Sequence, residues 1–179
     1  MRLGRVAGLL AVLATGTGTG VAQTIGSASI GPMVGVQVRG AGREAVVGGH
    51  ASFGFNAGPW FLGPEYTLVQ GSRTRARAIG LVVRLAGRGQ RLRPFVVGGA
   101  GSYEWSNRYE YRVPSGQTVV DWAGINYLSG SIGGGVELGA RGRFNPMVEV
   151  RYHGNIQRGD VVAAGRGLVT AAVGVQYHW

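Results

Sequence analysis

Eight segments of roughly ten residues, in which apolar residues alternate with small or polar ones, dominate this sequence. Successive side chains of a β-strand point to opposite faces, so this alternation predicts strands with one apolar face. In the final segment Val169, Val173 and Trp179 fall on one face, whereas Thr170 and Gln176 fall on the other. The eight segments span residues 30–39, 46–57, 60–70, 77–86, 94–105, 127–139, 144–154 and 167–179.

The N-terminus has the pattern of an export signal. Two arginines precede an apolar run over residues 6–14, and small residues follow as far as Ala22. This predicts a secretory signal peptide over residues 1–22, followed by a single domain over residues 23–179. No later stretch has the ~18 unbroken apolar residues of a membrane-spanning helix.

Composition excludes several classes of function. The chain has no cysteine, which removes disulfides and cysteine-ligated metals. The net charge is +10, but we find no basic helix or aromatic platform, so no nucleic-acid partner is expected. The three histidines fall at different heights along the predicted strands, and the glycine-rich stretch over residues 40–45 precedes another strand instead of a helix. We therefore expect no metal and no cofactor.

The alternation fits either a soluble lipocalin-like barrel, with its apolar face inside, or a membrane barrel, with its apolar face outside. The polar faces hold mostly Gly, Ala, Ser and Thr, which is too little charge for a surface in water. Aromatic residues also gather near both ends of the segments, as in the interfacial girdles of membrane barrels. One group comprises Phe55, Trp60, Phe61, Phe95, Phe144 and Trp179, and the other Tyr103, Trp105, Tyr127 and Tyr152. We predict an all-β fold, an eight-stranded antiparallel up-and-down transmembrane β-barrel.

The polar faces then line a narrow lumen that contains charged residues. Unpaired buried charges are very unfavourable, so we expect these groups to pair with one another. Eight strands leave an interior that side chains fill, which predicts a plugged lumen instead of an open pore. The predicted lumenal ion-pair network comprises Arg39, Glu65, Arg84, Glu104, Glu137, Glu149 and Arg151.

The longest connection lies between the fifth and sixth segments. Its two halves alternate, and Pro114-Ser115-Gly116 is a turn signal between them. We interpret residues 107–125 as a β-ribbon above the membrane that binds an extracellular partner by strand addition or stacking. The candidate binding residues are Arg108, Tyr109, Tyr111, Arg112 and Trp122.

The signal peptide, the glycine-rich segments PFVVGGAGSY and GSIGGGVEL, the segment PMVEVRYH and the C-terminus together resemble a known family. The chain is similar to the small eight-stranded outer-membrane barrels of the OmpA-like and OmpX-like, opacity-type group. The resemblance implies that Gly174, Tyr177 and Trp179 form the assembly signal read by the outer-membrane assembly machinery. It also implies a location in the outer membrane of a Gram-negative-type bacterium, in contact with membrane lipid and lipopolysaccharide.

These observations favour a non-enzymatic protein with a structural or surface-interaction role and no catalytic residues. Arginines near the outer strand ends are candidates for contacts with lipopolysaccharide phosphates. They are Arg43, Arg73, Arg75, Arg158 and Arg166. The alternatives are a lipid A-modifying enzyme, a small-solute channel and the soluble lipocalin-like binder. His50 and Ser52, two apart on one face, are the residues that keep the enzyme alternative open.

Overall fold

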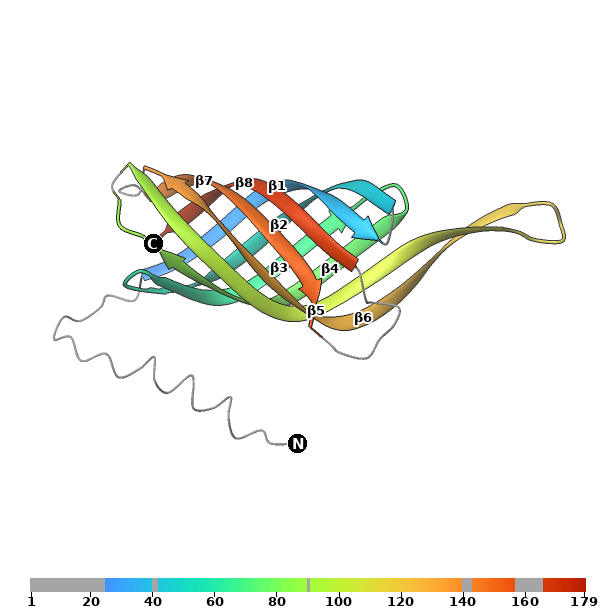
Figure 1. The fold of residues 1–179 in the computed structure, drawn as a ribbon, viewed down its shortest axis with the longest axis horizontal. Coiled ribbons are helices and arrows are strands. Elements are labelled where there is room, and N and C mark those ends of the chain that lie inside the picture. Colours follow the sequence, from blue (N-terminus) through green and yellow to red (C-terminus); the bar gives the residue numbers. More distant parts are fainter. Residues whose placement is uncertain (1–24, 40–41, 90, 140–142, 157–165) are drawn as a thin grey trace, which may run out of the picture.

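A closed β-barrel forms the body of the protein in a computed structural model that describes residues 25–39, 42–89, 91–139, 143–156 and 166–179. Each strand pairs antiparallel with the next along the chain, and the first strand pairs with the last (Figure 1). All eight predicted segments form strands, so the predicted eight-stranded transmembrane fold is confirmed. The predicted signal peptide, residues 1–22, lies outside the described residues.

The strands differ from the predicted segments mainly in length. Their bounds are β1 (Ile25–Arg39), β2 (Gly42–Ala57), β3 (Trp60–Gln70), β4 (Thr74–Ala86), β5 (Leu92–Arg112), β6 (Thr118–Leu138), β7 (Phe144–Asn155) and β8 (Arg166–His178). The 21 residues of β5 and of β6 make them the longest strands of the sheet. Within these ranges, no helix is long and apolar enough to cross a bilayer.

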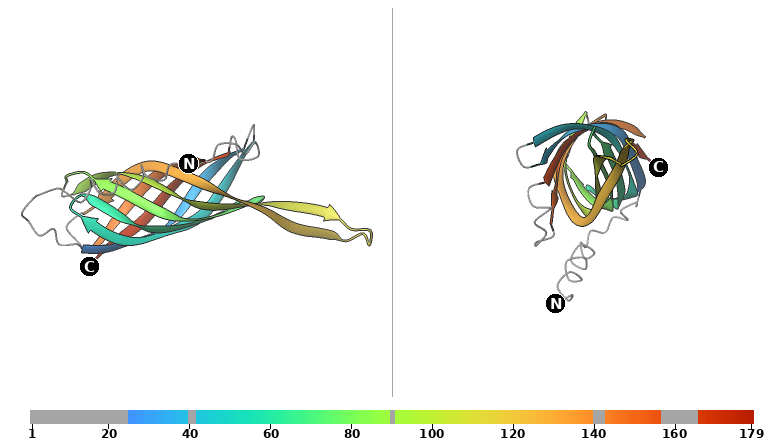
Figure 2. Two further views of the ribbon diagram at one scale, coloured as in Figure 1. Left: turned by 90° about the horizontal axis from the view of Figure 1, so that it is seen from below. Right: turned by 90° about the vertical axis from the view of Figure 1, so that its right-hand side faces the viewer.

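The two ends of the barrel have different connections. At one end, here called the turn end, β8 finishes close to the turn between β2 and β3, where Gly58 adopts a φ of 60°. At the opposite loop end, β5 and β6 continue far beyond their neighbours (Figures 1 and 2). The last residue of β5 that pairs with β4 is Asn107, so residues 108–122 form a protruding hairpin.

Apolar side chains cover the outside of the barrel, and polar ones point inside. Exposed aliphatic residues occur on every wall, including Leu81 on β4, Ile132 on β6 (70% exposed) and Val173 on β8. Arg84 and Glu137 are buried within the lumen. A soluble lipocalin-like barrel has its apolar face inside and its polar face outside, so the observed arrangement excludes that alternative. The closed sheet also leaves no free edge that lipid would have to solvate.

The seam between β1 and β8 contains one irregularity. Ile30 pairs with Val175 and Met33 with Ala172, but Gly31 and Pro32 have no partner in the register between them. Proline has no N–H to donate to a ladder. A Cβ on Gly31 would lie 2.4 Å from the carbonyl oxygen of Val173, so only glycine allows this close approach of the strands.

The outer wall predicts the effect of an added charge. Leu81→Arg places a cation in the middle of the apolar wall and should lower the free energy of unfolding by about 2–4 kcal/mol. Urea unfolding from lipid vesicles, followed by tryptophan fluorescence, measures the change. The control is Asn126→Arg, at an exposed position beyond the apolar wall, which should cost at most about 1 kcal/mol. Equal costs at both sites would contradict the placement of the membrane.

Candidate functional site

The lumen contains an ion-pair network centred on Arg151 of β7. Its Nη1 lies 2.5 Å from Oε1 of Glu65 on β3, and its Nη2 lies 2.6 Å from Oε1 of Glu149. The Nε group donates a further hydrogen bond of 2.7 Å to Glu149. One guanidinium therefore joins two carboxylates from different walls of the barrel. Such charge-assisted contacts are the strongest hydrogen bonds available to side chains.

A second arginine, Arg84 of β4, continues the network towards the turn end. Its guanidinium lies 3.5 Å from Glu137 and 4.0 Å from Glu149, and it donates a hydrogen bond to Gln176. The same guanidinium lies over the ring of Phe95 at 4.7 Å, a cation–π contact. Glu137 in turn is 2.7 Å from Nη2 of Arg93, at the turn end.

The structure brings together five of the seven predicted lumenal residues: Glu65, Arg84, Glu137, Glu149 and Arg151. Arg39 ends β1, and its side chain is outside the described part. Arg93 belongs to the network but was missed, although its two-residue spacing from Phe95 puts both on one face.

The prediction for Glu104 was wrong. Tyr103 and Trp105 are the inward residues of this part of β5, and Glu104 is exposed on the outer wall opposite Arg77. The assignment assumed that polar residues must face the lumen. Near the loop end, however, the outer wall leaves the apolar belt, so a carboxylate there is hydrated while aromatic rings fill the lumen.

The predicted aromatic girdles are therefore only partly correct. Phe55, Trp60, Phe144, Tyr152 and Trp179 are exposed on the outside. The others are buried in the lumen: Phe61, Phe95, Tyr103, Trp105 and Tyr127.

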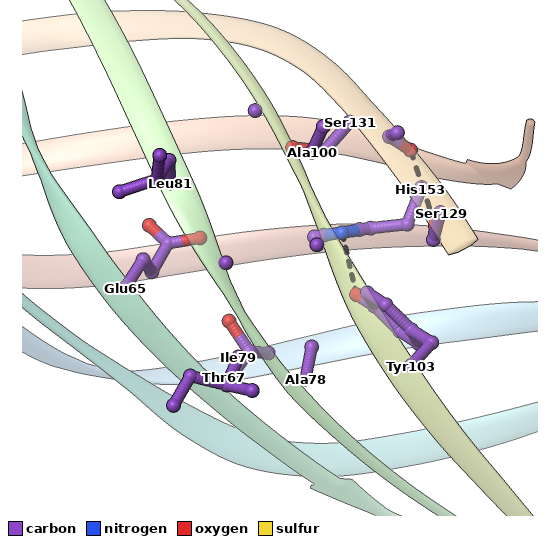
Figure 3. Close-up of a pocket in the computed structure, with 14 residues that line it drawn as sticks. Glu65, Thr67, Ala78, Ile79, Leu81, Ala100, Tyr103, Ser129, Ser131 and His153 are labelled. Carbon is purple, nitrogen blue, oxygen red and sulfur yellow. Dashed lines mark hydrogen bonds between the residues drawn. The ribbon is translucent and has the colours of Figure 1, made fainter. Parts of the chain in front are cut away.

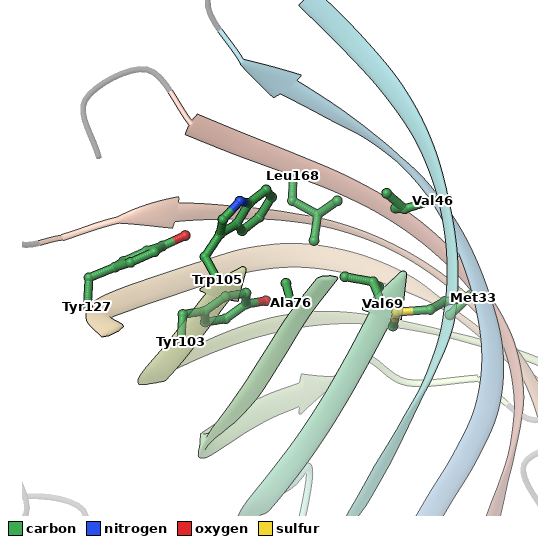
Figure 4. Packing of buried hydrophobic residues seen from close by; sticks show 9 residues of the cluster. Met33, Val46, Val69, Ala76, Tyr103, Trp105, Tyr127 and Leu168 are labelled. Carbon is green, nitrogen blue, oxygen red and sulfur yellow. The ribbon is translucent and has the colours of Figure 1, made fainter. Parts of the chain in front are cut away.

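Three of these buried aromatic residues, Tyr103, Trp105 and Tyr127, form a cluster near the loop end (Figure 4). Its other members are Met33, Val46, Val69, Ala76, Leu168 and Ala172. Phe61 and Phe95 belong to a second cluster, near the turn end, with Val82, Ala86, Val97 and Met147. The lumen is thus filled by apolar packing as well as by charges.

A small void remains between the network and the aromatic cluster. It has a volume of about 30 Å³ and is lined by Glu65, Tyr103 and His153 among others (Figure 3). Tyr103 and His153 meet there, with 2.6 Å between the Tyr103 hydroxyl oxygen and Nδ1 of the imidazole. Nε2 of His153 lies 3.2 Å from the Thr170 hydroxyl. A void of this size holds about one water molecule.

The histidines do not form a metal site in the part of the chain that the structure describes, where no group of three potential ligands occurs. His50 and His153 are buried in the lumen, and His178 lies near the turn end, 3.5 Å from the amide of Asn56. Ser52 is the neighbour of His50 on the same face. Its hydroxyl oxygen forms a hydrogen bond of 2.7 Å with the hydroxyl oxygen of Ser29.

The residues of the predicted assembly signal lie at the barrel seam and the turn end. Tyr177 packs against Phe144 at 4.8 Å and against Trp179 at 6.0 Å between ring centroids. The Trp179 N–H donates to the carbonyl of Gly26, where any Cβ would collide with the Trp179 ring. Gly174 lies inside, where a Cβ would approach the Ile30 carbonyl oxygen to 2.9 Å. The signalling role of these residues stays a prediction.

The protruding hairpin continues the ladder of the barrel without interruption. Arg108 pairs with Trp122 and Arg112 with Thr118, and the Gly116 N–H donates to the Val113 carbonyl in the tip turn. Tyr109 and Tyr111 lie on one face and are about half exposed, at 50% and 51%. Arg108 forms an ion pair of 2.7 Å with Glu110 on the opposite face. All five predicted binding residues are thus held on this hairpin.

Among the residues described, one edge of β6 is open along the hairpin. The register between β6 and β7 ends at Ser129 and Asn155, so residues 118–126 pair with β5 alone in the described part of the chain. Backbone groups along such an edge are a template for strand addition.

The predicted rim arginines occupy different surroundings. Arg43 and Arg73 are exposed at the loop end. Arg75 is half-buried because its guanidinium stacks on Trp122 at 5.1 Å. Arg158 and the side chain of Arg166 fall outside the described residues.

A closed barrel with an apolar outer wall and a charged, filled lumen defines the class of transmembrane β-barrels. No protein-family profile and no curated protein matches the sequence. Solved structures, however, share the fold. Neisserial surface protein A is 11% identical and has a TM-score of 0.68 over 86% of this chain and 97% of its own.

Ail, the attachment invasion locus protein of Yersinia pestis, crystallised with the heparin analogue sucrose octasulfate, is 12% identical. Its TM-score is 0.58, over 87% of this chain and 99% of its own. The N-terminal β-barrel domain of Pseudomonas aeruginosa OprF is 14% identical, with a TM-score of 0.53 over 87% of this chain and all of that domain. The chain therefore has the fold of the small eight-stranded outer-membrane β-barrels, as its resemblance to the OmpA-like and OmpX-like group predicted.

The network predicts a large effect for Arg151→Leu. The substitution leaves Glu65 and Glu149 buried without their main cation, so the free energy of unfolding should fall by about 3–5 kcal/mol. Urea unfolding in detergent micelles measures it. In the exposed pair on the hairpin, Glu110→Ala should cost less than about 1 kcal/mol. Comparable losses would show that the lumenal pairs contribute no more than a surface pair.

Glu44, near the loop end of β2, anchors the connection between β3 and β4. Its carboxylate accepts hydrogen bonds from the Arg73 N–H at 2.7 Å, the Thr74 hydroxyl at 2.7 Å and the Ser72 hydroxyl at 3.0 Å. Burial alone would raise the pKa of Glu44, but these hydrogen bonds outweigh it and lower the pKa below its usual value.

The anchor predicts a pH-dependent connection. Because the folded pKa of Glu44 is lowered, its stabilising contribution is present above the ordinary glutamate pKa and disappears as the pH falls through the folded value. Hydrogen exchange at the Arg73 amide should lose protection over that range. Glu44→Gln should remove this dependence and speed tryptic cleavage after Arg73 at neutral pH, whereas Glu110→Gln should change neither. Unchanged cleavage in Glu44→Gln would contradict the anchor.

Proposed function

We propose that this protein is a non-enzymatic β-barrel of a Gram-negative-type outer membrane that binds a surface partner through its protruding hairpin. The observation that carries the proposal is the extension of β5 and β6 beyond the barrel as one paired ribbon. The β7 wall ends at Asn155, well before the hairpin, so the β6 edge is accessible among the described residues. Beyond its base, where Arg75 contacts Trp122, the ribbon pairs with no further strand among the described residues, so it does not contribute to closing the barrel.

The chemistry of the hairpin favours a protein segment as the partner. Residues 108–122 contain two arginines and two acids, so the hairpin has no net charge. A polyanion such as the ligand in the Ail structure therefore gains little attraction from it. The open β6 edge offers main-chain hydrogen bonds, and Tyr109 and Tyr111 offer rings with half of their surface free. This combination suits strand addition, with tyrosine contacts that select the side chains of the added strand.

The outer-membrane location rests on the lipid-compatible wall and on the C-terminal strand. The shared fold with Neisserial surface protein A and with the Yersinia attachment protein supports both the location and a surface role. The predicted assembly signal, Gly174, Tyr177 and Trp179, would direct insertion by the outer-membrane assembly machinery.

A non-enzymatic, non-conducting role fits the lumen better than the alternatives. The histidine nearest a serine in sequence, His50, is only 4% exposed and lies on the lumenal face of β2, not among the lipid-facing side chains. Nucleophile and base must approach the reacting group together. The lumen is occupied by the guanidinium groups of Arg84 and Arg151 and by the aromatic cluster around Trp105. The charged groups and the aromatic cluster both oppose the passage of solutes.

Replacing residues 109–121 with Asn-Gly tests the proposal. Asn-Gly forms a tight two-residue turn, so the pair of Arg108 with Trp122 is kept as the last pair of the shortened hairpin. Adhesion of bacteria carrying the protein to neighbouring cells and to protein-coated surfaces should fall about tenfold or more, equivalent to ~1.4 kcal/mol. Arg43→Ala, at the rim but off the hairpin, is the matched control. A heat-shifted gel verifies that each variant forms the barrel. Undiminished adhesion by a folded deletion variant would refute the role of the hairpin.

A further inference from the structure

The outer wall of the barrel carries an apolar groove across β1, β2 and β3. Its volume is about 490 Å³, within the range of about 300–1,000 Å³ that is usual for small-molecule sites. Almost all of its surface comes from apolar atoms. The lining residues are Ile30, Gly31, Pro32, Gly49, Ala51, Tyr66 and Leu68, with a contribution from His50.

The groove exists because small residues interrupt the apolar wall. Gly49 pairs with Pro32 on one side and with Leu68 on the other, so this rung has no side chain at its centre. The next rung holds only the methyl group of Ala51 between Ile30 and Tyr66. Elsewhere the same face of β2 carries bulky residues, such as Phe53. The hollow is therefore a local feature of these two rungs.

The groove runs from the middle of the apolar wall towards the loop end. Pro32 lies midway along β1, whereas Leu68 lies two residues before the end of β3. The register partner of Leu68 on β4 is Arg77, and the partner of Gln70 is Arg75. The outer face of β4 carries Ile79, Leu81 and Val83 in its apolar part. Nearer the loop end the same face carries Arg77 and Arg75. Two cations thus stand where the groove meets the boundary of the apolar wall.

The two arginines are available to a ligand. Arg75 is held over the Trp122 ring, and its Nη2 lies 3.5 Å from the side-chain oxygen of Gln70. Stacking uses the face of a guanidinium and leaves its N–H edge free to donate. Arg77 is exposed and, among the described residues, makes no ion pair, although Glu104 stands opposite in the register. Planar guanidinium groups match phosphate oxygens with paired hydrogen bonds.

We propose that this surface binds one phosphorylated glycolipid of the outer leaflet, of the lipid A class. An acyl chain fills the groove over Gly49 and Ala51, and a headgroup phosphate accepts hydrogen bonds from Arg75 and Arg77. Hydrocarbon is the medium around this wall, which makes a lipid chain the natural occupant of an apolar hollow at that depth. The arginines lie at the end that bears the hairpin, which is the outer-leaflet side of an outer-membrane barrel.

This inference concerns a site on the barrel wall, which meets the protruding hairpin only at its base, where Arg75 stacks on Trp122. It depends on the outer-membrane placement but not on any surface partner, so the two proposals fail independently. A protein partner is a poor occupant, because the groove lies within the apolar wall and its centre is far from water. A lipid of the inner leaflet would place its phosphate at the turn end instead.

The test measures lipid retention by the full-length mature protein. Nanodiscs containing lipid A, dephosphorylated lipid A or phosphatidylglycerol as a minor component are the probes, and native mass spectrometry counts the molecules that remain bound after transfer to detergent. The wild-type protein should retain one lipid A, with dephosphorylated lipid A and phosphatidylglycerol retained at least tenfold less. The double substitution Arg75→Ala/Arg77→Ala should reduce lipid A retention at least tenfold.

Groove-filling and control variants complete the design. Ala51→Leu occupies the hollow and should also reduce retention, whereas Ala100→Leu, on the exposed wall of β5, should not. Arg112→Ala, near the hairpin tip, should retain lipid A as the wild type does. Heat-shifted mobility selects folded samples. Equal retention by the wild type and the double variant, equal retention of phosphorylated and dephosphorylated lipid A, or a preference for phosphatidylglycerol would each overturn the proposal.

Discussion

The pairing of β1 with β8 is the contact on which the rest of this structure depends. In hydrocarbon every unpaired backbone group costs several kcal/mol, so an eight-stranded sheet is tolerated only when its first and last strands meet. The seam achieves this closure even though Pro32 lacks an N–H, because Gly31 and Gly174 allow the two backbones to come close. Trp179 then packs over Gly26 at the end of the same seam. Residues of the predicted assembly signal therefore also complete the ring.

Closure leaves a lumen that the chain must fill with its own side chains. The wall in contact with lipid takes most of the aliphatic residues, so the interior receives charged and aromatic ones. Two arginines form ion pairs with three carboxylates in the lumen, so opposite charges are paired there and are kept away from lipid. Aromatic clusters on both sides of the network exclude most of the remaining space, and the rings of Phe61 and Phe95 also lie beside Arg84. Charge pairing and apolar packing act together on Arg84, which contacts both carboxylates and aromatic rings.

The sequence was sufficient to predict the barrel, and for β3 it predicted both ends of the strand. This succeeded because a lipid-facing wall requires strict alternation, which is visible along any single segment. It was not sufficient where the wall leaves the lipid. On β5, Tyr103 and Glu104 exchange the faces assigned to them, since near the loop end neither face needs to be apolar. The β-ribbon predicted over residues 107–125 is the continuation of β5 and β6. Arg93 was missed because its place in the network depends on neighbours brought in by the fold. The groove at Gly49 depends on three strands at once and is invisible in any one of them.

The protruding hairpin, which we propose as a binding surface, is an extension of the barrel's own strands. The ladder that pairs Tyr103 with Tyr127 inside the lumen continues, rung by rung, to the pair of Arg112 with Thr118 outside it. Side chains on one face of β5 differ in exposure between the barrel and the hairpin. Trp105 is 2% exposed within the barrel, whereas Tyr109, four residues further along the same face, is half exposed. A ribbon held in register by the barrel has already lost much of its conformational freedom. A partner strand that adds to β6 would therefore meet an edge that needs little further ordering, which reduces the entropic cost of binding. The register that closes the barrel would thus also prepare the hairpin for the partner that we propose.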